Sequence, residues 1–422
     1  MWGTAVTALR GLGFRFAVVL VALRVLPFPF IDIDPIEAVA ERYWGAWEPA
    51  VRASGDLLGI AIPARVPTGS GDTAFDWTLA LLHLVIAAIA AGAWFALDRG
   101  GARRDRYPRV GRTAFTVLRY WLAMNMWAYG LAKVFDVQFY APPLTRLIHP
   151  AGELSPMGLL WTFMGYSRPY TMFAGFAECA AGALLLARRT TTLGALIACA
   201  VMANVVMLNF SYDVGVKLHS SSLLIAAIAL VVPDARRLIG AVLGGGVPAK
   251  PVAVRDPSRF ARARSVAAWV VVLAYVGVLV MQNASYARIV ANDHRSPLVG
   301  MYDVDAFVRD GETVPLDPAR GERWREVAFD YQRAYIRWMD GRNVLFGAPI
   351  DSAHHTVTLR ELFARTPGGA VFTYERAANG VVTLDGSLDR AVLHVVLRPR
   401  DVSQQLLFRR GFHWIQEQPF NR

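Results

Sequence analysis

The sequence predicts an all-α polytopic membrane bundle of about seven transmembrane helices, followed by a small β-rich extracytoplasmic domain. Three observations support this fold class. Of the 422 residues, 55% are hydrophobic and only 18% are charged, a combination that is rare in soluble proteins of this length. Apolar runs of about 20 residues recur through the first two thirds of the chain. From Gly300 onward, short runs rich in β-branched and aromatic residues replace them.

Seven apolar runs are candidate membrane spans, because crossing the hydrocarbon core takes about 20 residues of helix. In chain order they are 11–28, 76–97, 113–135, 169–187, 191–209, 215–232 and 265–281. The first and sixth are short. Arg24 interrupts the first run, and Leu26-Pro27-Phe28-Pro29 follows where a cleaved signal peptide carries small residues. We therefore expect a retained first helix.

Basic residues gather in alternate loops, which predicts the orientation of the helices. Cytoplasmic loops carry the excess of Arg and Lys, and the loops that contain it here hold Arg99, Arg103, Arg104, Arg106, Arg109, Arg112, Arg188, Arg189, Arg236, Arg237, Lys250, Arg255, Arg259, Arg262 and Arg264. The loops between them are acidic or nearly neutral. An odd number of helices then gives a cytoplasmic N-terminus and an extracytoplasmic C-terminal domain. Because these residues form no continuous stripe, the net charge of +11 does not indicate nucleic-acid binding.

These patterns divide the chain into five segments. They are N-terminal transmembrane helices with an external loop (1–112), a four-helix transmembrane core (113–235), a basic cytoplasmic loop (236–264), a seventh transmembrane helix (265–282) and the β-rich domain (300–422). Within the external loop, Trp44, Trp47, Val51 and Leu58 recur at helical spacing, which predicts an interfacial helix over 36–58. Residues 66–73 (VPTGSGDT) predict a turn before the second helix.

The C-terminal domain is expected to be a compact antiparallel sheet, either a small sandwich or a barrel. Turn signals such as Asp340-Gly341, Asn379-Gly380 and Asp385-Gly386 separate several of its strands. The expected strands are 324–330, 335–339, 343–346, 356–362, 370–374, 381–384, 392–397 and 405–408. The chain's two cysteines, Cys179 and Cys199, both lie in apolar runs, so no disulfide framework is expected in this domain.

Three motifs carry a resemblance to a known family. They are GLAK at 130–133, GFAECAAG at 175–182 followed by LLL at 184–186, and RRTTTLGAL at 188–196. The pattern resembles the DoxX-like family of four-helix bacterial membrane proteins, whose helices carry a GxxK ending and a GxxExxxG core. The stretches 155–166, 204–217 and 410–422 are similar to a larger, multi-helix branch of that family with an extracytoplasmic tail.

The resemblance covers about 119–232 and bears more on fold than on chemistry. It implies the bacterial inner membrane. The family name comes from a subunit associated with thiosulfate:quinone oxidoreductase, so a quinone is the cofactor that the resemblance suggests. Most members have no assigned activity.

Glu178 is the sharpest chemical signal in the sequence. It lies near the middle of its apolar run, where an ionised carboxylate costs roughly 2.5–3.5 kcal/mol on insertion scales. Small residues on the same face (Ala174, Gly175, Ala181 and Gly182) would let a neighbouring helix approach closely and shield it from lipid. Two interpretations are open: a protonated glutamate that joins helices by a hydrogen bond, or a carboxyl coupled to protons or quinol.

Asn125, Tyr129 and Lys133 recur every fourth residue and form one polar stripe on the preceding helix. With Glu178 they are the candidate catalytic residues. Antiparallel packing would place Asn125 at the depth of Glu178 and Lys133 about 12 Å nearer the outside. We therefore expect Asn125 or Tyr129 to be the partner of Glu178. Lys133 is expected to pair with Asp136 or Asp213, or to be a helix-end lysine that snorkels to the interface.

Further polar residues predict a substrate-binding vestibule open to the outside: His83, Asn204, Asn209, Asp213, Lys217 and His219. Their spacing matches no compact ligand motif, so no metal is expected. His149, His354 and His355 are expected to be solvated. In the C-terminal run 410–414, with Glu417 and Arg422, we expect Trp414 in the core and the charges at its rim. Docking of this run onto the membrane is the alternative.

Three functional hypotheses follow, and whether the protein is an enzyme stays open. The first is a membrane component of a quinone-linked redox system. The chain lacks haem-ligand His pairs, a CxxCH site, a nucleotide-binding Gly motif and an iron–sulfur Cys set, so electrons would come from a bound quinone or a partner protein. The second is a non-enzymatic anchor or scaffold that presents the β domain to a periplasmic or membrane protein partner. The third is a small-molecule or proton transporter.

Overall fold

The computed structural model describes residues 2–28, 33, 37–65, 69–98, 107–245, 259–293, 296–319, 321–330, 332–362 and 369–418. Expectations on other positions, including Asp32, Arg99–Arg106, Lys250, Arg255 and Arg422, lie outside these residues. The chain forms two compact units. The helical unit comprises Met1–Phe139 and Pro156–Ala284, and the barrel unit comprises Tyr140–Ser155 and Ser285–Arg422.

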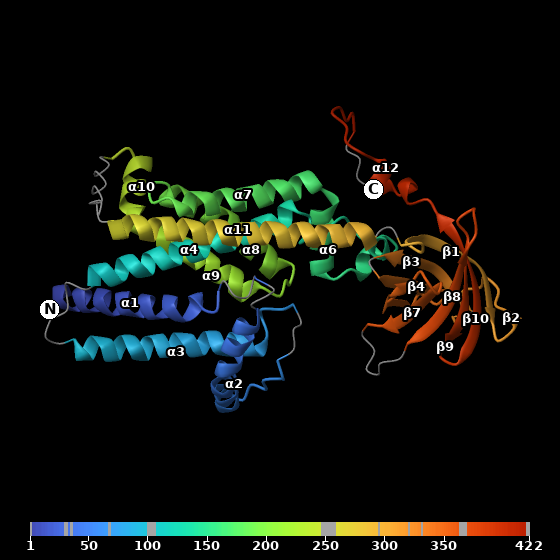
Figure 1. The fold of residues 1–422 in the computed structure, drawn as a ribbon, viewed down its shortest axis with the longest axis horizontal. Helices are drawn as coiled ribbons and strands as arrows, with labels where there is room; N and C mark the ends of the chain where they lie inside the picture. The colour runs from blue at the N-terminus through green and yellow to red at the C-terminus, as the bar shows by residue number, and fades with distance from the viewer. Residues whose placement is uncertain are drawn as a thin grey trace. The chain divides into compact units, whose positions relative to one another are not determined.

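Each predicted span coincides with a helix of the structure (Figure 1). The helices of the helical unit are α1 (Trp2–Val25), α2 (Glu37–Leu58), α3 (Ala74–Leu97), α4 (Tyr107–Val134), α6 (Pro156–Tyr166), α7 (Arg168–Leu186), α8 (Thr191–Ser211), α9 (Lys217–Val231) and α10 (Ala235–Val242), together with α11 (Arg259–Asp293), whose last residues belong to the barrel unit. The seven expected runs fall on α1, α3, α4, α7, α8, α9 and α11. The predicted interfacial helix is α2.

Four segments in the described part of the chain are long and apolar enough to cross a bilayer: α3, α7, α8 and Val266–Ala291 within α11. This supports a membrane protein. Of the other expected spans, α1 and α4 carry several basic residues. The remaining one, α9, has 15 residues, fewer than the roughly 20 that a full crossing needs. The count of seven spans stays a prediction.

The centre of the helical unit is a ring of four helices, because α4 packs on α7, α7 on α8, α8 on α9 and α9 on α4. Fully buried side chains meet inside it, among them Leu122 of α4, Leu185 of α7, Ala198 of α8 and Leu223 of α9. Buried apolar residues of α11 join this core. The ring covers the segment in which the sequence predicted a four-helix core.

The contact between α4 and α7 is unusually close because glycines face each other. A Cβ atom on Gly175 would lie 2.7 Å from the carbonyl oxygen of Gly130, and one on Gly130 would lie 2.6 Å from Sγ of Cys179. About two turns further along α7, Gly182 lies against Trp127. No larger residue fits at these positions without moving a backbone. This approach brings Lys133 of the polar stripe against Glu178.

The 66–73 segment, described from Gly69 onward, serves a structural purpose. The amide of Gly71 donates to the Gly215 carbonyl (2.7 Å), and the Asp72 carboxylate accepts from the amides of Lys217 (2.7 Å) and Leu218 (2.9 Å). Asp72 therefore satisfies the free N–H groups at the start of α9, where a negative charge is also favoured by the helix dipole. Thr73 and Asp76 form a capping box that begins α3.

The C-terminal strands close into an antiparallel barrel. The described strands are β1 (Gly300–Arg309), β2 (Glu312–Thr313), β3 (Trp324–Asp330), β4 (Arg333–Trp338), β5 (Asn343–Gly347), β6 (Ile350–Asp351), β7 (Thr356–Glu361), β8 (Ala370–Arg376), β9 (Val382–Leu388) and β10 (Ala391–Arg400). The order is β10-β9-β8-β7-β5-β4-β3-β1-β2, and β10 also pairs with β1. This pairing decides between the predicted alternatives in favour of a barrel (Figure 1).

Large side chains fill the barrel interior. Tyr302, Phe307, Trp324, Phe329 and Phe372 are all among its fully or almost fully buried residues. Closure removes the exposed sheet edges that an open sheet would present. The barrel is therefore a packed core.

Several sequence expectations for this unit differ from the structure. The expected strand at 405–408 is wrong: it is the short helix α12 (Leu406–Arg409), preceded by a 3-10 turn in which the Asp401 side chain accepts from the amide of Ser403. A cap of this kind favours a helical turn. Strand β1 was not among the expected strands, although it pairs with both β3 and β10. Trp414, expected in the core, is 91% exposed.

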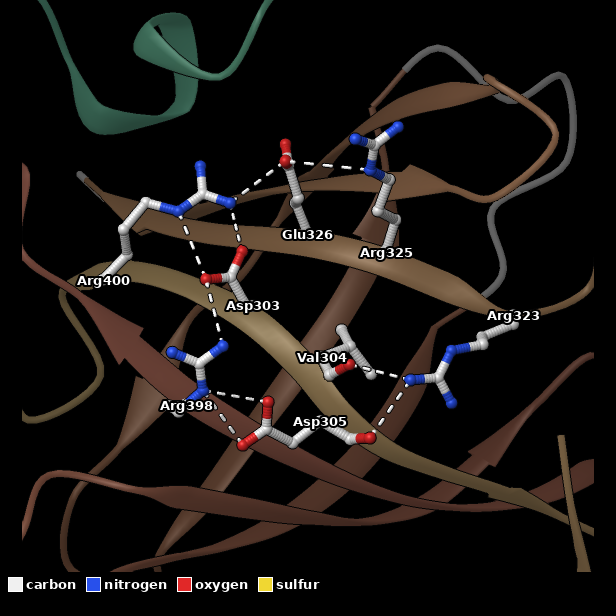
Figure 2. A network of polar contacts seen from close by, with 8 residues as sticks. All are labelled: Asp303, Val304, Asp305, Arg323, Arg325, Glu326, Arg398 and Arg400. Atoms are coloured by element: carbon white, nitrogen blue, oxygen red, sulfur yellow. Dashed lines mark hydrogen bonds and ion pairs between the residues drawn. The ribbon is translucent and has the colours of Figure 1, made fainter. Parts of the chain in front are cut away.

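Ion pairs reinforce the seam where the barrel closes (Figure 2). On the outward face of the barrel, Arg400 of β10 pairs with Asp303 of β1 and with Glu326 of β3. Arg398 of β10 pairs with Asp303 and Asp305 of β1. Arg323 adds hydrogen bonds to the backbone of β1. Its guanidinium is buried and donates to the carbonyls of Val304 (2.8 Å), Val314 (2.8 Å) and Asp305 (3.2 Å). It thereby joins β1 to the segment that follows β2.

The segment Tyr140–Ser155 belongs to the barrel unit although the chain reaches it between α4 and α6. Its short helix α5 (Leu144–Leu147) begins where the amide of Leu144 donates to the carboxylate of Asp330 (2.6 Å). Ile148 packs into a cluster with Met301, Ala328 and Tyr335. The predicted 113–235 core is therefore interrupted by a piece of the other unit.

His149 of this segment, expected to be solvated, is only partly exposed. Its ring lies 4.5 Å from that of Tyr335, and burial lowers the pKa of His149 while Glu153 opposes the shift. His354 does lie at the surface, where a hydrogen bond to Asp351 raises the pKa of its imidazole. His355 is also exposed.

We expect Gly175→Ala to destabilise the protein by about 1–3 kcal/mol, because the new methyl group overpacks the α4–α7 contact. Thermal unfolding of the full chain in detergent measures this. Gly92→Ala in α3 is the matched control, since a Cβ there meets nothing within 4 Å. Equal unfolding temperatures for the two variants would contradict the close approach.

We expect Arg323→Met to weaken the barrel by about 2–3 kcal/mol, because three carbonyls lose a charged donor. Hydrogen exchange of β1 and β3 in the full chain should become faster. Arg325→Met is the control: that side chain is 52% exposed and pairs only loosely with Glu326, at 3.9 Å. Similar exchange in the two variants would show that Arg323 is not a structural tie.

Candidate functional site

A buried ion pair between Lys133 and Glu178 is the centre of the candidate site. The lysine Nζ lies 2.9 Å from Oε1 and 2.8 Å from Oε2 of the carboxylate. Glu178 is 1% exposed and Lys133 is 5% exposed. Both oxygens therefore share one cation, which offsets part of the cost of removing the two charges from water.

This pair corrects the expectation that Asn125 or Tyr129 would be the partner of Glu178. The expected register set Asn125 opposite Glu178. In the structure Gly130 lies against both Gly175 and Cys179, so Glu178 lies about one helical turn nearer the C-terminal end of α4. The long lysine side chain covers the remaining distance.

The two carboxylates proposed as partners of Lys133 are engaged elsewhere, so that expectation was wrong. Asp136 pairs with Arg168 at 2.7 Å. Asp213 pairs with Lys217 at 2.8 Å, and this hydrogen bond lowers the pKa of the exposed Asp213 carboxyl. Lys133 is also no snorkelling lysine, because its ammonium is buried against Glu178.

A cavity of about 200 Å³ adjoins the ion pair within the helical unit. Its wall is mostly apolar, with Leu160, Met164, Met202, Val205 and Leu208 among the lining residues. The polar groups that line it include those of Tyr129, Lys133, Gln138, Glu178, Asn204, Asn209, His219 and Ser220. An apolar pocket with a few convergent polar groups is typical of a small-molecule site.

A second polar group of residues joins α4 to α9 at this cavity. Nε2 of His219 lies 3.2 Å from Oδ1 of Asn125, and the rings of His219 and Tyr129 are 5.9 Å apart. The ammonium nitrogen Nζ of Lys133 lies over the ring of Tyr129, 5.6 Å from the ring centroid. All four candidate catalytic residues therefore lie close together, and His219 links Asn125 to the ring of Tyr129.

The predicted vestibule is brought together only in part. Asn204, Asn209 and His219 line the cavity, and Asn209 donates to Ser220 (3.0 Å). His83 is buried elsewhere, with its ring 4.8 Å from that of Trp47 in α2. Asp213 and Lys217 are not among the lining residues. Lys217 instead takes part in the contact of α9 with Asp72 and Asp213.

Sequence reasoning missed two contributions to the cavity wall. One comes from α6, and the other comes from Phe139, which follows α4. Phe139 stacks edge-on against Trp161 at 5.0 Å, and both line the cavity. The apolar run of α6 has only 11 residues, too few to suggest a span. Its concentration of Met and Trp just before α7 was the available signal.

In the described residues, no three His, Cys, Asp or Glu side chains are grouped so that they could hold a metal ion. The arrangement instead offers hydrogen-bond donors and acceptors around an apolar space. The buried Glu178 and Lys133 can also hold a proton between them. These features suit the binding of a small ring compound that carries oxygen atoms.

Fold and site together define a helical membrane protein with a lysine–glutamate pair beside a cavity, joined to a C-terminal β-barrel. Over 144 residues the chain is 36% identical to the uncharacterized protein YwoB of Bacillus subtilis (strain 168), covering 34% of this chain and 90% of YwoB. The chain therefore belongs to the same family as YwoB. No family model and no solved structure matches the chain.

We expect Lys133→Met and Glu178→Met each to destabilise the protein by about 3–5 kcal/mol, because each leaves one buried charge unpaired. The double variant should recover most of this loss, since no charge is left in the core. Thermal unfolding in detergent gives the double-mutant cycle. Asp213→Asn, which breaks the exposed pair with Lys217, serves as control and should leave the unfolding temperature nearly unchanged. Additive losses in the double variant would contradict a direct pair.

Proposed function

We propose that this protein binds the ring of a quinone in its cavity and acts as a membrane component of a quinone-linked redox system. The proposal includes a DoxX-like four-helix core, seven spans in the bacterial inner membrane, a cytoplasmic N-terminus and an extracytoplasmic barrel. The observation that carries it is the cavity wall, where an apolar surface meets the buried Lys133–Glu178 pair.

The size of the cavity supports a small ring. Sites for drug-sized ligands usually measure about 300–1,000 Å³, and this one measures about 200 Å³. A single oxygen-bearing ring is compatible with that space, and a haem or dinucleotide is not. An isoprenoid tail would lie along the bundle and lipid rather than inside the cavity.

The lining residues fit such a ring. Lys133 can donate a hydrogen bond to a ring oxygen, and the apolar residues Leu160, Met164 and Met202 can pack on its faces. A bound quinone would supply two-electron redox chemistry. Lys133 and Glu178 would hold a proton next to the ring oxygen, and the apolar wall would exclude water.

A scaffold that presents the barrel to a partner protein is the alternative. It is favoured by the C-terminal segment of the barrel unit, where Phe412, Trp414 and Ile415 are 77%, 91% and 78% exposed. Exposed aromatic residues of this kind are typical of protein or membrane interfaces.

We expect native mass spectrometry of the gently solubilised full chain to detect a retained quinone. Ala174→Phe should reduce the bound quinone severalfold, because Ala174 lines the cavity and the larger ring fills part of it. Ala180→Phe is the matched control, since Ala180 lies on the same helix, is exposed and is not a lining residue.

The same spectra distinguish the two candidate functions. A protein subunit retained without any quinone would contradict the redox proposal and support the scaffold. Equal quinone content in the wild type and both variants would show that the quinone is bound elsewhere.

A further inference from the structure

The orientation of the Asn125 side chain is fixed by its own helix. Its Nδ2 lies 2.8 Å from the backbone carbonyl oxygen of Trp121. A carbonyl oxygen can only accept a hydrogen bond, so the amide nitrogen must be the atom that faces it. The amide oxygen Oδ1 therefore faces the other way, toward α9.

That orientation determines which nitrogen of His219 carries a proton. Nε2 of His219 lies 3.2 Å from Oδ1 of Asn125. Because Oδ1 can only accept, Nε2 must be the donor. In an uncharged imidazole the second nitrogen, Nδ1, then carries a lone pair and accepts hydrogen bonds.

No side chain of the described residues uses this lone pair. Within the described part of the chain, the His219 side chain makes one hydrogen bond, to Asn125. The His219 ring also contacts the rings of Trp121 (6.2 Å) and Tyr129 (5.9 Å). His219 also lines the cavity. A ligand in the cavity can therefore supply the missing donor.

We propose that His219 selects the ligand of this cavity by accepting a hydrogen bond at Nδ1, so that a ring bearing a hydroxyl binds more tightly than the same ring bearing a carbonyl. This inference rests on the proposed function and adds the preferred form of the ligand. A hydroxyl can donate to Nδ1, whereas a carbonyl oxygen would set two lone pairs against each other. Lys133 does not discriminate, because its ammonium can donate to either oxygen.

In this arrangement Asn125 is a positioning residue. It does not line the cavity and acts only through the tautomer of His219. The selectivity therefore depends on a chain of two hydrogen bonds, from the Trp121 carbonyl through Asn125 to the imidazole. A hydrogen bond to one ring nitrogen of a histidine commonly sets the tautomer, and so decides whether the other nitrogen donates or accepts a hydrogen bond.

The tautomer can be measured without any ligand. In the full chain labelled with ¹⁵N-histidine, we expect His219 to show a protonated Nε2 and an unprotonated Nδ1. Asn125→Ala removes the acceptor at Nε2 and should let both tautomers appear. A proton on Nδ1 in the wild type, whether from the other tautomer or from a charged ring, would overturn the proposal.

The selectivity is tested with two probes of the same shape, trimethylhydroquinone and trimethyl-1,4-benzoquinone. Binding is measured anaerobically by equilibrium dialysis of the full chain in nanodiscs, with empty nanodiscs subtracted. The wild type should prefer the hydroquinone by about fivefold, the ratio that one net hydrogen bond provides. His219→Phe keeps a ring but removes the acceptor, so the preference should disappear. His219→Asn can place a carbonyl oxygen where Nδ1 lies and should restore it.

The outcomes separate this inference from the function on which it rests. Equal affinity of the wild type for both probes overturns the selectivity and leaves the cavity as a binding site. A preference that survives in His219→Phe overturns the role of His219. If neither probe binds, the proposed function and this inference both fail.

Discussion

The close approach of α4 and α7 around the Lys133–Glu178 pair is the constraint on which the helical unit depends. Two charges removed from water are tolerated only where each satisfies the other, and here both carboxylate oxygens contact one ammonium. The close backbone approach at Gly130 and Gly175 brings α4 and α7 together beside this pair. It also fixes the register of α4 against α7, and through it the position of every polar group on the cavity wall.

The residues of the site come from helices that are far apart in the sequence. Glu178 comes from α7, Lys133 and Tyr129 from α4, His219 and Ser220 from α9, and Asn204 and Asn209 from α8, so each helix of the ring contributes. Asp72, outside the ring, caps the first turn of α9, two residues before His219. The apolar residues of α6 complete the wall. The polar groups on the wall of this cavity therefore come together only when all four helices of the ring are assembled.

Much of the fold follows from local patterns, and much of the site does not. Hydrophobic length located the helices, and the alternation of strand residues located most of the barrel. The small residues beside Glu178 correctly indicated a close helix contact. What failed was the register of α4 against α7. Depth was counted from helix centres, which assigned Lys133 to Asp136 or Asp213. In the structure the Gly130–Gly175 contact shifts α4 by about one turn relative to α7.

His83 was misplaced because its burial depends on Trp47, a partner distant in sequence. Trp414 was misplaced because an aromatic residue was assumed to be buried, whereas its side chain is 91% exposed. Strand β1 was overlooked because Asp303 and Asp305 on its outer face conceal the apolar alternation.

The segment Tyr140–Ser155 imposes an order on biosynthesis. Its apolar residues Leu144, Leu147 and Ile148 leave the ribosome long before Met301, Ala328 and Tyr335, the residues that cover them in the folded protein. Until then they need temporary shelter from a chaperone or the bilayer surface. For the same reason the bundle cannot be isolated by a single cut after α11, since the shortened chain would keep a strip of barrel surface with nothing to cover it.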